Sequence, residues 1–219
     1  MEDVEFFPSQ GARTPGAPAS SRPCPKEWFH RGYLPHVDHP DFVQLITFRL
    51  ADSLPWDVLE RWTIELAHLP NQEQQTERER RIREWLDQGH GACWLRGERI
   101  ATVVEDALLH FDGQRYRLLA WCVMPNHVHV VIETFREQSL SHTVHSWKSF
   151  TATQANRILG RTGVFWQREY HDRFMRNDEH LRQTVEYVEY NPVKAGLVRQ
   201  AEDWRFSSAR YRGKEESEG

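Results

Sequence analysis

The chain has 219 residues, of which 39% are hydrophobic and 27% are charged, a composition typical of a globular protein with one substantial domain. A mean hydropathy of -0.73, without an apolar run near the ~20 residues of a membrane span, excludes an integral membrane protein. Three well-separated cysteines without a CxxC motif exclude a disulfide framework. The acidic first residues lack the order of a signal peptide, so we expect a cytoplasmic location. The net charge of -4 argues, by itself, against a nucleic-acid-binding protein.

The first half of the chain predicts one strand followed by helices. Residues 1–26 are dense in Pro, Gly, Ala and Ser and predict a disordered leader. Residues 42–50 alternate and are rich in β-branched and aromatic residues, which indicates a strand. A charge run, residues 77–84, is typical of the solvated face of a helix. Helices are predicted at about 55–68, 76–88 and 97–111, with a polar break after Pro70 between the first two.

The second half alternates strands and helices. Two strands, 116–124 and 127–133, flank Pro125-Asn126, and a helix follows at 139–159. Residues 165–174 predict a short strand or extended loop. A last helix, from 178 to Tyr190, should end at Asn191-Pro192 because the residue before proline avoids helical angles.

This order predicts an α+β fold with a ferredoxin-like βαββαβ antiparallel sheet. A helical insertion at about 51–112 follows the first strand. The main domain is expected over 27–212, with an acidic tail at 213–219.

The sequence His127-Val-His129 on the third strand is the first candidate site. Side chains alternate along a strand, so both histidines should face away from the core that Val128 and Val130 enter. Two imidazoles at this spacing can share one metal ion. Taken alone, the pattern also fits two surface histidines on an amphipathic strand.

The last helix carries the second candidate. Leu181, Val185 and Val188 define its buried stripe, and Tyr187 and Asn191 lie together on the flank of that stripe, one turn apart. They could present a phenol and a metal ligand to one point. Alternatively, Tyr187 is a core-edge residue and Asn191 a C-terminal cap.

Together these segments resemble a known family, the HUH single-strand transposases with one catalytic tyrosine, and within it the REP-associated tyrosine transposases. The resemblance spans about residues 28–212, and Met-Pro-Asn-His-x-His with a later Tyr-x-x-x-Asn-Pro-Val is its most specific part. The matching stretches are Arg31 to His36, Ile46 to Arg49, Trp121 to His129, Phe165 to Asp172 and Tyr187 to Lys194.

The resemblance implies a metal-dependent single-stranded DNA endonuclease and strand transferase that acts on hairpin or palindromic repeat DNA. Tyr187 would be the nucleophile on a C-terminal catalytic helix and would form a 5′-phosphotyrosine link. His127, His129 and Asn191 would hold Mg²⁺ or Mn²⁺. Two alternatives are a domesticated protein that binds structured single strands without cutting, and a metal-dependent nuclease that uses water. Relatives include homodimers and monomers, and the sequence does not choose between them.

Candidate DNA contacts are basic residues of the second half of the chain: Lys148, Arg157, Arg168, Arg173, Arg176 and Lys194. Trp166, Tyr170 and Phe174 could stack on bases or pack in the core. His171 and Asp172 could support the metal ligands.

The charge is distributed unevenly along the chain. Residues 1–135 carry a net charge of -6, residues 136–212 carry +4, and the last seven residues carry -2. Because attraction to phosphate depends on the local field, the overall acidity does not exclude DNA.

Overall fold

The computed structural model describes residues 29–30, 35–36 and 42–215. The predicted leader at 1–26 therefore lies outside the described residues, as do residues 216–219 of the predicted acidic tail. The start of that tail belongs to the short helix α6 (Ala209–Glu215).

A four-stranded antiparallel sheet forms the centre of the fold. Its order is β4-β5-β3-β6, and every neighbouring pair is antiparallel. This is the strand order of a ferredoxin-like βαββαβ sheet, which confirms the predicted fold class. The strands are β3 (Val43–Arg49), β4 (Tyr116–Val123), β5 (His127–Thr134) and β6 (His171–Phe174). A separate two-stranded ladder joins β1 (Phe29–His30) and β2 (Pro35–His36).

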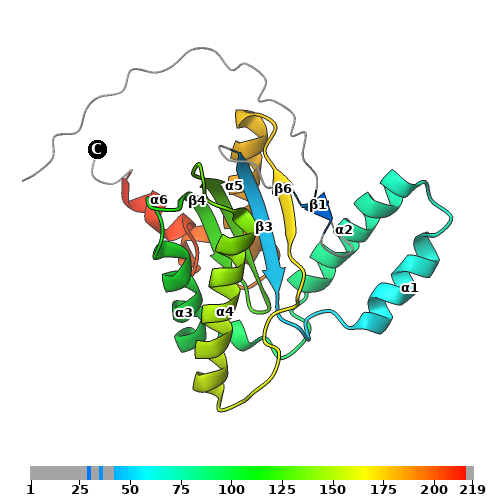
Figure 1. Ribbon diagram of the computed structural model, residues 1–219, viewed down its shortest axis with the longest axis horizontal. Helices are drawn as coiled ribbons and strands as arrows, with labels where there is room; N and C mark the ends of the chain where they lie inside the picture. The colour runs from blue at the N-terminus through cyan, green and yellow to red at the C-terminus, as the bar shows by residue number, and fades with distance from the viewer. Residues whose placement is uncertain (1–28, 31–34, 37–41, 216–219) are drawn as a thin grey trace, which may run out of the picture.

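Helices cover both faces of the sheet (Figure 1). On one face, α3 (Glu98–Leu109) and α4 (Leu140–Leu159) pack on Val128, Val130 and Ile132 of β5. On the other, α5 (Asp178–Lys194) packs on Val131 and its neighbours. The alternation of β5 between two apolar layers fixes which side chains can meet α5.

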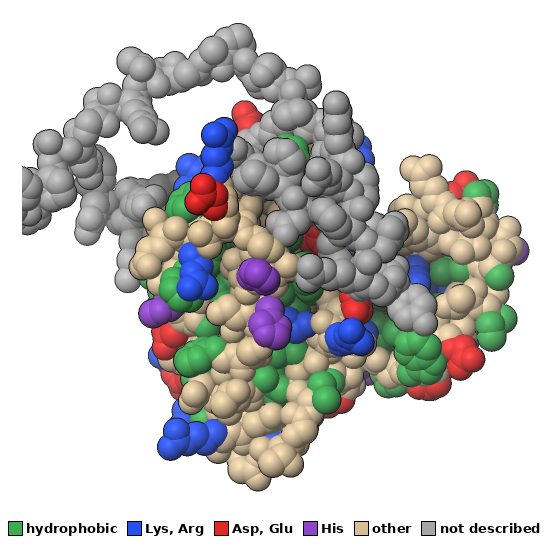
Figure 2. All heavy atoms as spheres, viewed as in Figure 1, with side chains coloured by type: hydrophobic (Ala, Val, Ile, Leu, Met, Phe, Trp, Pro, Cys, Tyr) green, Lys and Arg blue, Asp and Glu red, His purple; other side chains and the backbone are tan. Residues whose placement is uncertain are grey.

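The predicted insertion at 51–112 has two structurally different parts. The helices α1 (Trp56–Leu66) and α2 (Asn71–Asp87) form a hairpin that projects from the sheet (Figure 1) and has a small apolar cluster of its own. In the space-filling view this hairpin is a lobe beside the sheet domain, with hydrophobic and acidic side chains on its outer surface (Figure 2). By contrast, α3 is buried against the sheet as a crossover helix, with Leu108 fully inaccessible.

Two predicted boundaries are wrong. The polar residues after Pro70 are the first turn of α2, in which Glu73 complements the helix dipole, so the helix begins at Asn71. The final helix continues through Pro192 to Lys194, because burial of this turn outweighs the loss of one backbone hydrogen bond. The segment 165–174, predicted as a short strand or extended loop, contains the short strand β6 after a loop with a single bridge between Trp166 and Leu50. Short 3-10 turns, η1 (Trp94–Arg96) and η2 (Ala201–Asp203), complete the fold.

Truncation of Leu108 tests whether α3 belongs to the core while the hairpin of α1 and α2 lies outside it. Leu108→Ala should lower the free energy of unfolding by about 2–5 kcal/mol, because it opens a cavity between α3 and the sheet. Ile64→Ala on α1 should change it by less than about 0.5 kcal/mol, because Ile64 is 73% exposed. Urea unfolding measures both, and equal effects would contradict the assignment of α3 to the core.

Candidate active site

The histidine pair, His127 and His129, lies on β5 beneath α5. Both side chains point to the face opposite Val128 and Val130, as the alternation predicts, but they are buried, with 1% and 2% exposure. Their Nε2 atoms are 3.1 Å apart. The interpretation as two surface histidines is therefore wrong.

Each imidazole is oriented through its other nitrogen. The Nδ1 of His127 lies 2.7 Å from Oδ1 of Asn126, whose Nδ2 donates to the carbonyl of His90. Because that amide oxygen can only accept, His127 carries its proton on Nδ1 and leaves Nε2 as a bare acceptor. The Nδ1 of His129 lies 2.8 Å from the hydroxyl of Thr47 on β3, which can donate or accept. Both Nε2 atoms therefore converge on one point.

Helix α5 brings the two remaining predicted residues to the same place. The ring of Tyr187 lies edge-on to His129, with ring centroids 5.5 Å apart. Asn191 follows one turn later and is 1% exposed. Among the described residues, neither the Tyr187 hydroxyl nor either polar atom of the Asn191 side chain has a hydrogen-bond partner. Buried polar groups of this kind are costly unless a ligand satisfies them.

Burial sets the protonation of these groups. It lowers the pKa of His127 to about 3 and that of His129 well below its ordinary value, so both imidazoles are neutral at pH 7. Burial, reinforced by the charge of Asp87, raises the pKa of Tyr187 to about 12, although Arg83 and Asn191 act in the opposite direction. Tyr187 is thus a neutral phenol at pH 7.

The residues at this point fit a divalent metal ion. Two nitrogen ligands at about 2.1 Å and at right angles about one ion lie ~3 Å apart, close to the separation of the two Nε2 atoms. Neutral imidazoles are the form that binds metal, and hydrogen bonds to Nδ1 are the usual support. The unpartnered amide of Asn191 supplies an oxygen. Within the described residues no cluster of three His, Cys, Asp or Glu side chains could hold a metal.

A cleft of about 640 Å³ leads away from Tyr187 and His129, between α2, α5 and the open face of β3 and β6. Arg49 is half-buried in its wall, and desolvation lowers the pKa of its guanidinium to about 10. Its Nη1 donates to the Ser53 hydroxyl and to the Leu54 carbonyl. Four arginines line the cleft: Arg49, Arg78, Arg83 and Arg173.

The basic residues predicted to contact DNA are not all gathered here. Lys194 lies 6.0 Å from the centre of the Tyr187 ring, and Arg173 lines the cleft. Arg168 and Arg176 are exposed on the loops flanking β6, and Arg157 is exposed on α4, across the sheet from α5.

Lys148 has a structural contact instead. Its amine donates to the carbonyls of Gln167 and Arg168, both at 2.7 Å, and so ties the loop before β6 to α4. Burial lowers the pKa of this amine to about 8.

Only some of the predicted aromatic and supporting residues lie in the cleft. Trp166 is a core residue that packs edge-on against Phe48, whereas Tyr170 lines the cleft. His171 lies in the cleft, 3.4 Å from Glu79 of α2. Asp172 pairs in register with Ile46 and so belongs to the opposite face of the sheet.

Several residues of the site were not predicted from the sequence. Asn126 directly precedes the first histidine, and its position in the tight turn was the available signal. Thr47 shares a face with His129 only because β3 pairs with β5. Arg83 and Asp87 belong to the charged helix that the sequence predicts to be solvated. No local pattern distinguishes them from the exposed charges beside them.

Parts of the chain are similar to known proteins. Residues 96–191 match the family described as "Transposase IS200 like". A REP-associated tyrosine transposase of Escherichia coli strain K12 is 32% identical over 93 residues, which cover 42% of this chain and 54% of that protein. A Haemophilus influenzae protein assigned to the same class is 27% identical over 103 residues, covering 42% of this chain and 58% of that protein. A solved REP-associated tyrosine transposase bound to a REP hairpin has a TM-score of 0.49 at 18% identity, covering 84% of this chain and 82% of that one.

The segment that matches the IS200-like transposase family, residues 96–191, contains all four residues of the predicted site. The curated proteins to which the chain is similar are named REP-associated tyrosine transposases, in agreement with the family that the motifs predict. The aligned segments span a little over half of each relative's length. Among the described residues, no helix has the length and apolarity needed to cross a membrane.

The Lys148 contact predicts a pH dependence of stability. The folded pKa of about 8 lies below the ordinary 10.5, so the unfolded chain binds more protons between these two values. The contribution of Lys148 to stability should therefore rise as the pH increases from 8 to 10.5. The unfolding free energy of the wild type relative to Lys148→Met should increase by about 1–3 kcal/mol between pH 7 and pH 10.5. A pH-independent difference would mean that the amine is not buried.

Proposed function

We propose that this protein nicks and rejoins single-stranded DNA through a covalent bond to Tyr187. The observation that carries the proposal is the convergence of the Tyr187 phenol, two neutral imidazoles and an unpartnered amide at one end of an arginine-lined cleft. A nucleophile, a set of metal ligands and a cleft that can bind a polyanion meet there. These are the features that phosphoryl transfer requires.

The reaction is a transesterification. The Tyr187 oxygen forms a bond to phosphorus as the bond from phosphorus to the 3′ oxygen breaks. The phenol proton is lost and the departing oxygen gains one, leaving a 5′-phosphotyrosine and a free 3′-OH, so no nucleotide cofactor is needed. Attack by the 3′-OH of the same or another strand reverses the step and rejoins DNA.

His127, His129 and Asn191 would hold the divalent ion, with Mg²⁺ or Mn²⁺ proposed, and the ion would stabilise negative charge on the phosphate oxygens. Other residues of the chain position these ligands and the nucleophile. Asn126 and Thr47 hold the imidazoles in place, and the packing of α5 on the sheet fixes the Tyr187 ring against His129.

We further propose that the substrate is a hairpin formed by palindromic repeat DNA in the bacterial cytoplasm. The curated relatives are bacterial proteins named for their association with REP sequences. Supporting this, residues 136–212 carry a net charge of +4 in an otherwise acidic chain. Binding should be salt-sensitive because phosphate contacts release counterions.

Replacing the tyrosine provides the direct test. Incubation of the wild type with labelled hairpin DNA bearing single-stranded flanks and Mn²⁺ should give an adduct that survives denaturing electrophoresis. Tyr187→Phe should abolish the adduct and retain DNA affinity within about threefold, because only the nucleophilic oxygen is lost.

Tyr190→Phe is the matched control, since Tyr190 is 55% exposed on the same helix, and it should leave the adduct unchanged. DNA binding by the wild type without any adduct would favour a binding protein that does not cleave. Release of a 5′-phosphate without a covalent species would favour a nuclease that uses water.

Replacement of Asn126 tests the proposed metal site separately from DNA cleavage. Asn126→Ala removes the acceptor that orients His127 and should weaken Mn²⁺ binding about 10- to 100-fold in isothermal titration calorimetry. His127→Ala and His129→Ala should abolish binding while the protein remains folded, as judged by circular dichroism. Undiminished Mn²⁺ affinity in either histidine variant would contradict the proposed site.

A further inference from the structure

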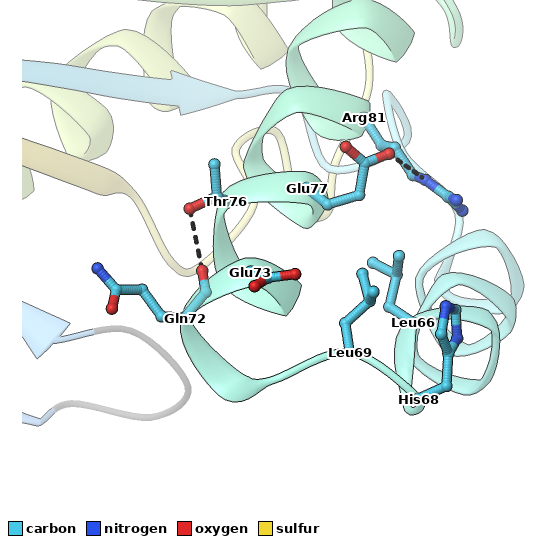
Figure 3. A pocket seen from close by; sticks show the side chains of 8 residues that line it. All are labelled: Leu66, His68, Leu69, Gln72, Glu73, Thr76, Glu77 and Arg81. Carbon is cyan, nitrogen blue, oxygen red and sulfur yellow. Dashed lines mark hydrogen bonds and ion pairs between the residues drawn. The ribbon is translucent and has the colours of Figure 1, made fainter.

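Helix α2 presents two chemically different faces. Glu77 and Arg81 lie on the side that meets the end of α1 (Figure 3), where they pair with each other and Arg81 also reaches Glu65. Glu79, Arg83 and Asp87 recur at intervals of four residues and therefore share a second face. The contacts of Glu79 and Asp87 show that this second face is turned toward the active site.

The two outer members of this face contact the sheet domain. Glu79 lies 3.4 Å from the Nε2 of His171 on β6. Asp87 accepts a hydrogen bond of 2.8 Å from Lys194, two turns after Tyr187 on α5. The helix is thus held at two points, one turn to either side of Arg83.

Arg83 lies between these contacts and lines the cleft with Tyr187 and His129. Its side chain is exposed, and its Nε makes a 3.3 Å contact with the carbonyl of Glu79, one turn earlier. No ion pair to Arg83 is formed within the described part of the chain. Most of its donors therefore face the cleft and are available to a ligand.

We propose that Arg83 of the inserted hairpin is a catalytic residue that binds a non-bridging oxygen of the DNA phosphate attacked by Tyr187. This assignment rests on the proposed strand-transfer function. A guanidinium matches the geometry of phosphate oxygens and keeps its charge at every working pH, so it can stabilise the additional negative charge of the transition state. Glu79 and Asp87 act as positioning residues, since they hold α2 rather than the DNA.

The experiment compares two arginines of one helix. Arg83→Gln should slow adduct formation at saturating hairpin DNA and Mn²⁺ about 10²-fold, the usual effect of removing one donor to a developing charge. Arg80→Gln is the matched control, since Arg80 pairs with Glu77 and Glu84 on the exposed side, and its rate should stay within about twofold of the wild type. Arg83→Lys should recover part of the loss. DNA affinity measured in the Tyr187→Phe background should fall less than tenfold with Arg83→Gln.

The outcomes separate this inference from the proposed function. A wild type that forms the adduct, with equal rates for Arg83→Gln and Arg80→Gln, would overturn the role of Arg83 and leave strand transfer intact. A wild type that forms no adduct would overturn strand transfer and this inference with it.

A double-mutant cycle tests the positioning contacts. Asp87→Asn should slow adduct formation about tenfold when Arg83 is present and have little further effect in the Arg83→Gln background, because Asp87 acts by holding the helix that places Arg83. Additive losses would show that Asp87 acts independently of Arg83 and would contradict its positioning role.

Discussion

The pairing of β5 with β3 is the constraint on which the site depends. In this register His129 lies opposite Thr47 and His127 opposite Arg49, while Val128 and Val130 enter the core beneath α3 and α4. Because side chains alternate with a period of two, a slip by one residue would drive both imidazoles into that core and turn the valines toward α5. The apolar layer therefore enforces the position of the histidine pair. Much of the accuracy of a polar site thus comes from hydrophobic packing on the far side of the same strand.

Much of this arrangement could be predicted from periodicity alone. Alternation placed His127 and His129 on one face, and helical spacing placed Tyr187 and Asn191 side by side. Burial of the histidines could not be predicted, since it depends on α5 covering that face of the sheet. The contact between Thr47 and His129 joins residues 82 positions apart, so only the strand order reveals it. Local patterns predict which face of a strand or helix a residue occupies. The residue that it contacts on that face is decided by the tertiary fold.

In the charged helix α2, sequence spacing likewise does not show which charges face the cleft. Its run of glutamates and arginines satisfies the spacing of a solvated helix, and one side, with Arg80 and Glu84, is indeed exposed. The same spacing produces the second face, where Arg83 and Asp87 meet the cleft and α5. A net charge of -4 conceals this difference between the two faces, because four arginines but only two glutamates, Glu79 and Glu169, line the cleft. The field at a site is decided by which charges are turned toward it.

The hairpin of α1 and α2 enters the chain between β3 and the crossover helix α3, inside the loop that closes when β3 pairs with β5. The chain entropy lost on closing a loop grows only with the logarithm of its length, by about 0.6 kcal/mol for each doubling. Added length at this point therefore costs the sheet little, and the hairpin supplies its own small apolar cluster around Leu59. A segment of this kind can be exchanged without disturbing the register of β3 and β5. The strands and α5 hold the histidine pair and Tyr187, whereas the cleft wall that carries Arg83 is an insertion. A change in the hairpin would therefore alter that wall, and the phosphate contact proposed for Arg83, without moving the histidine pair.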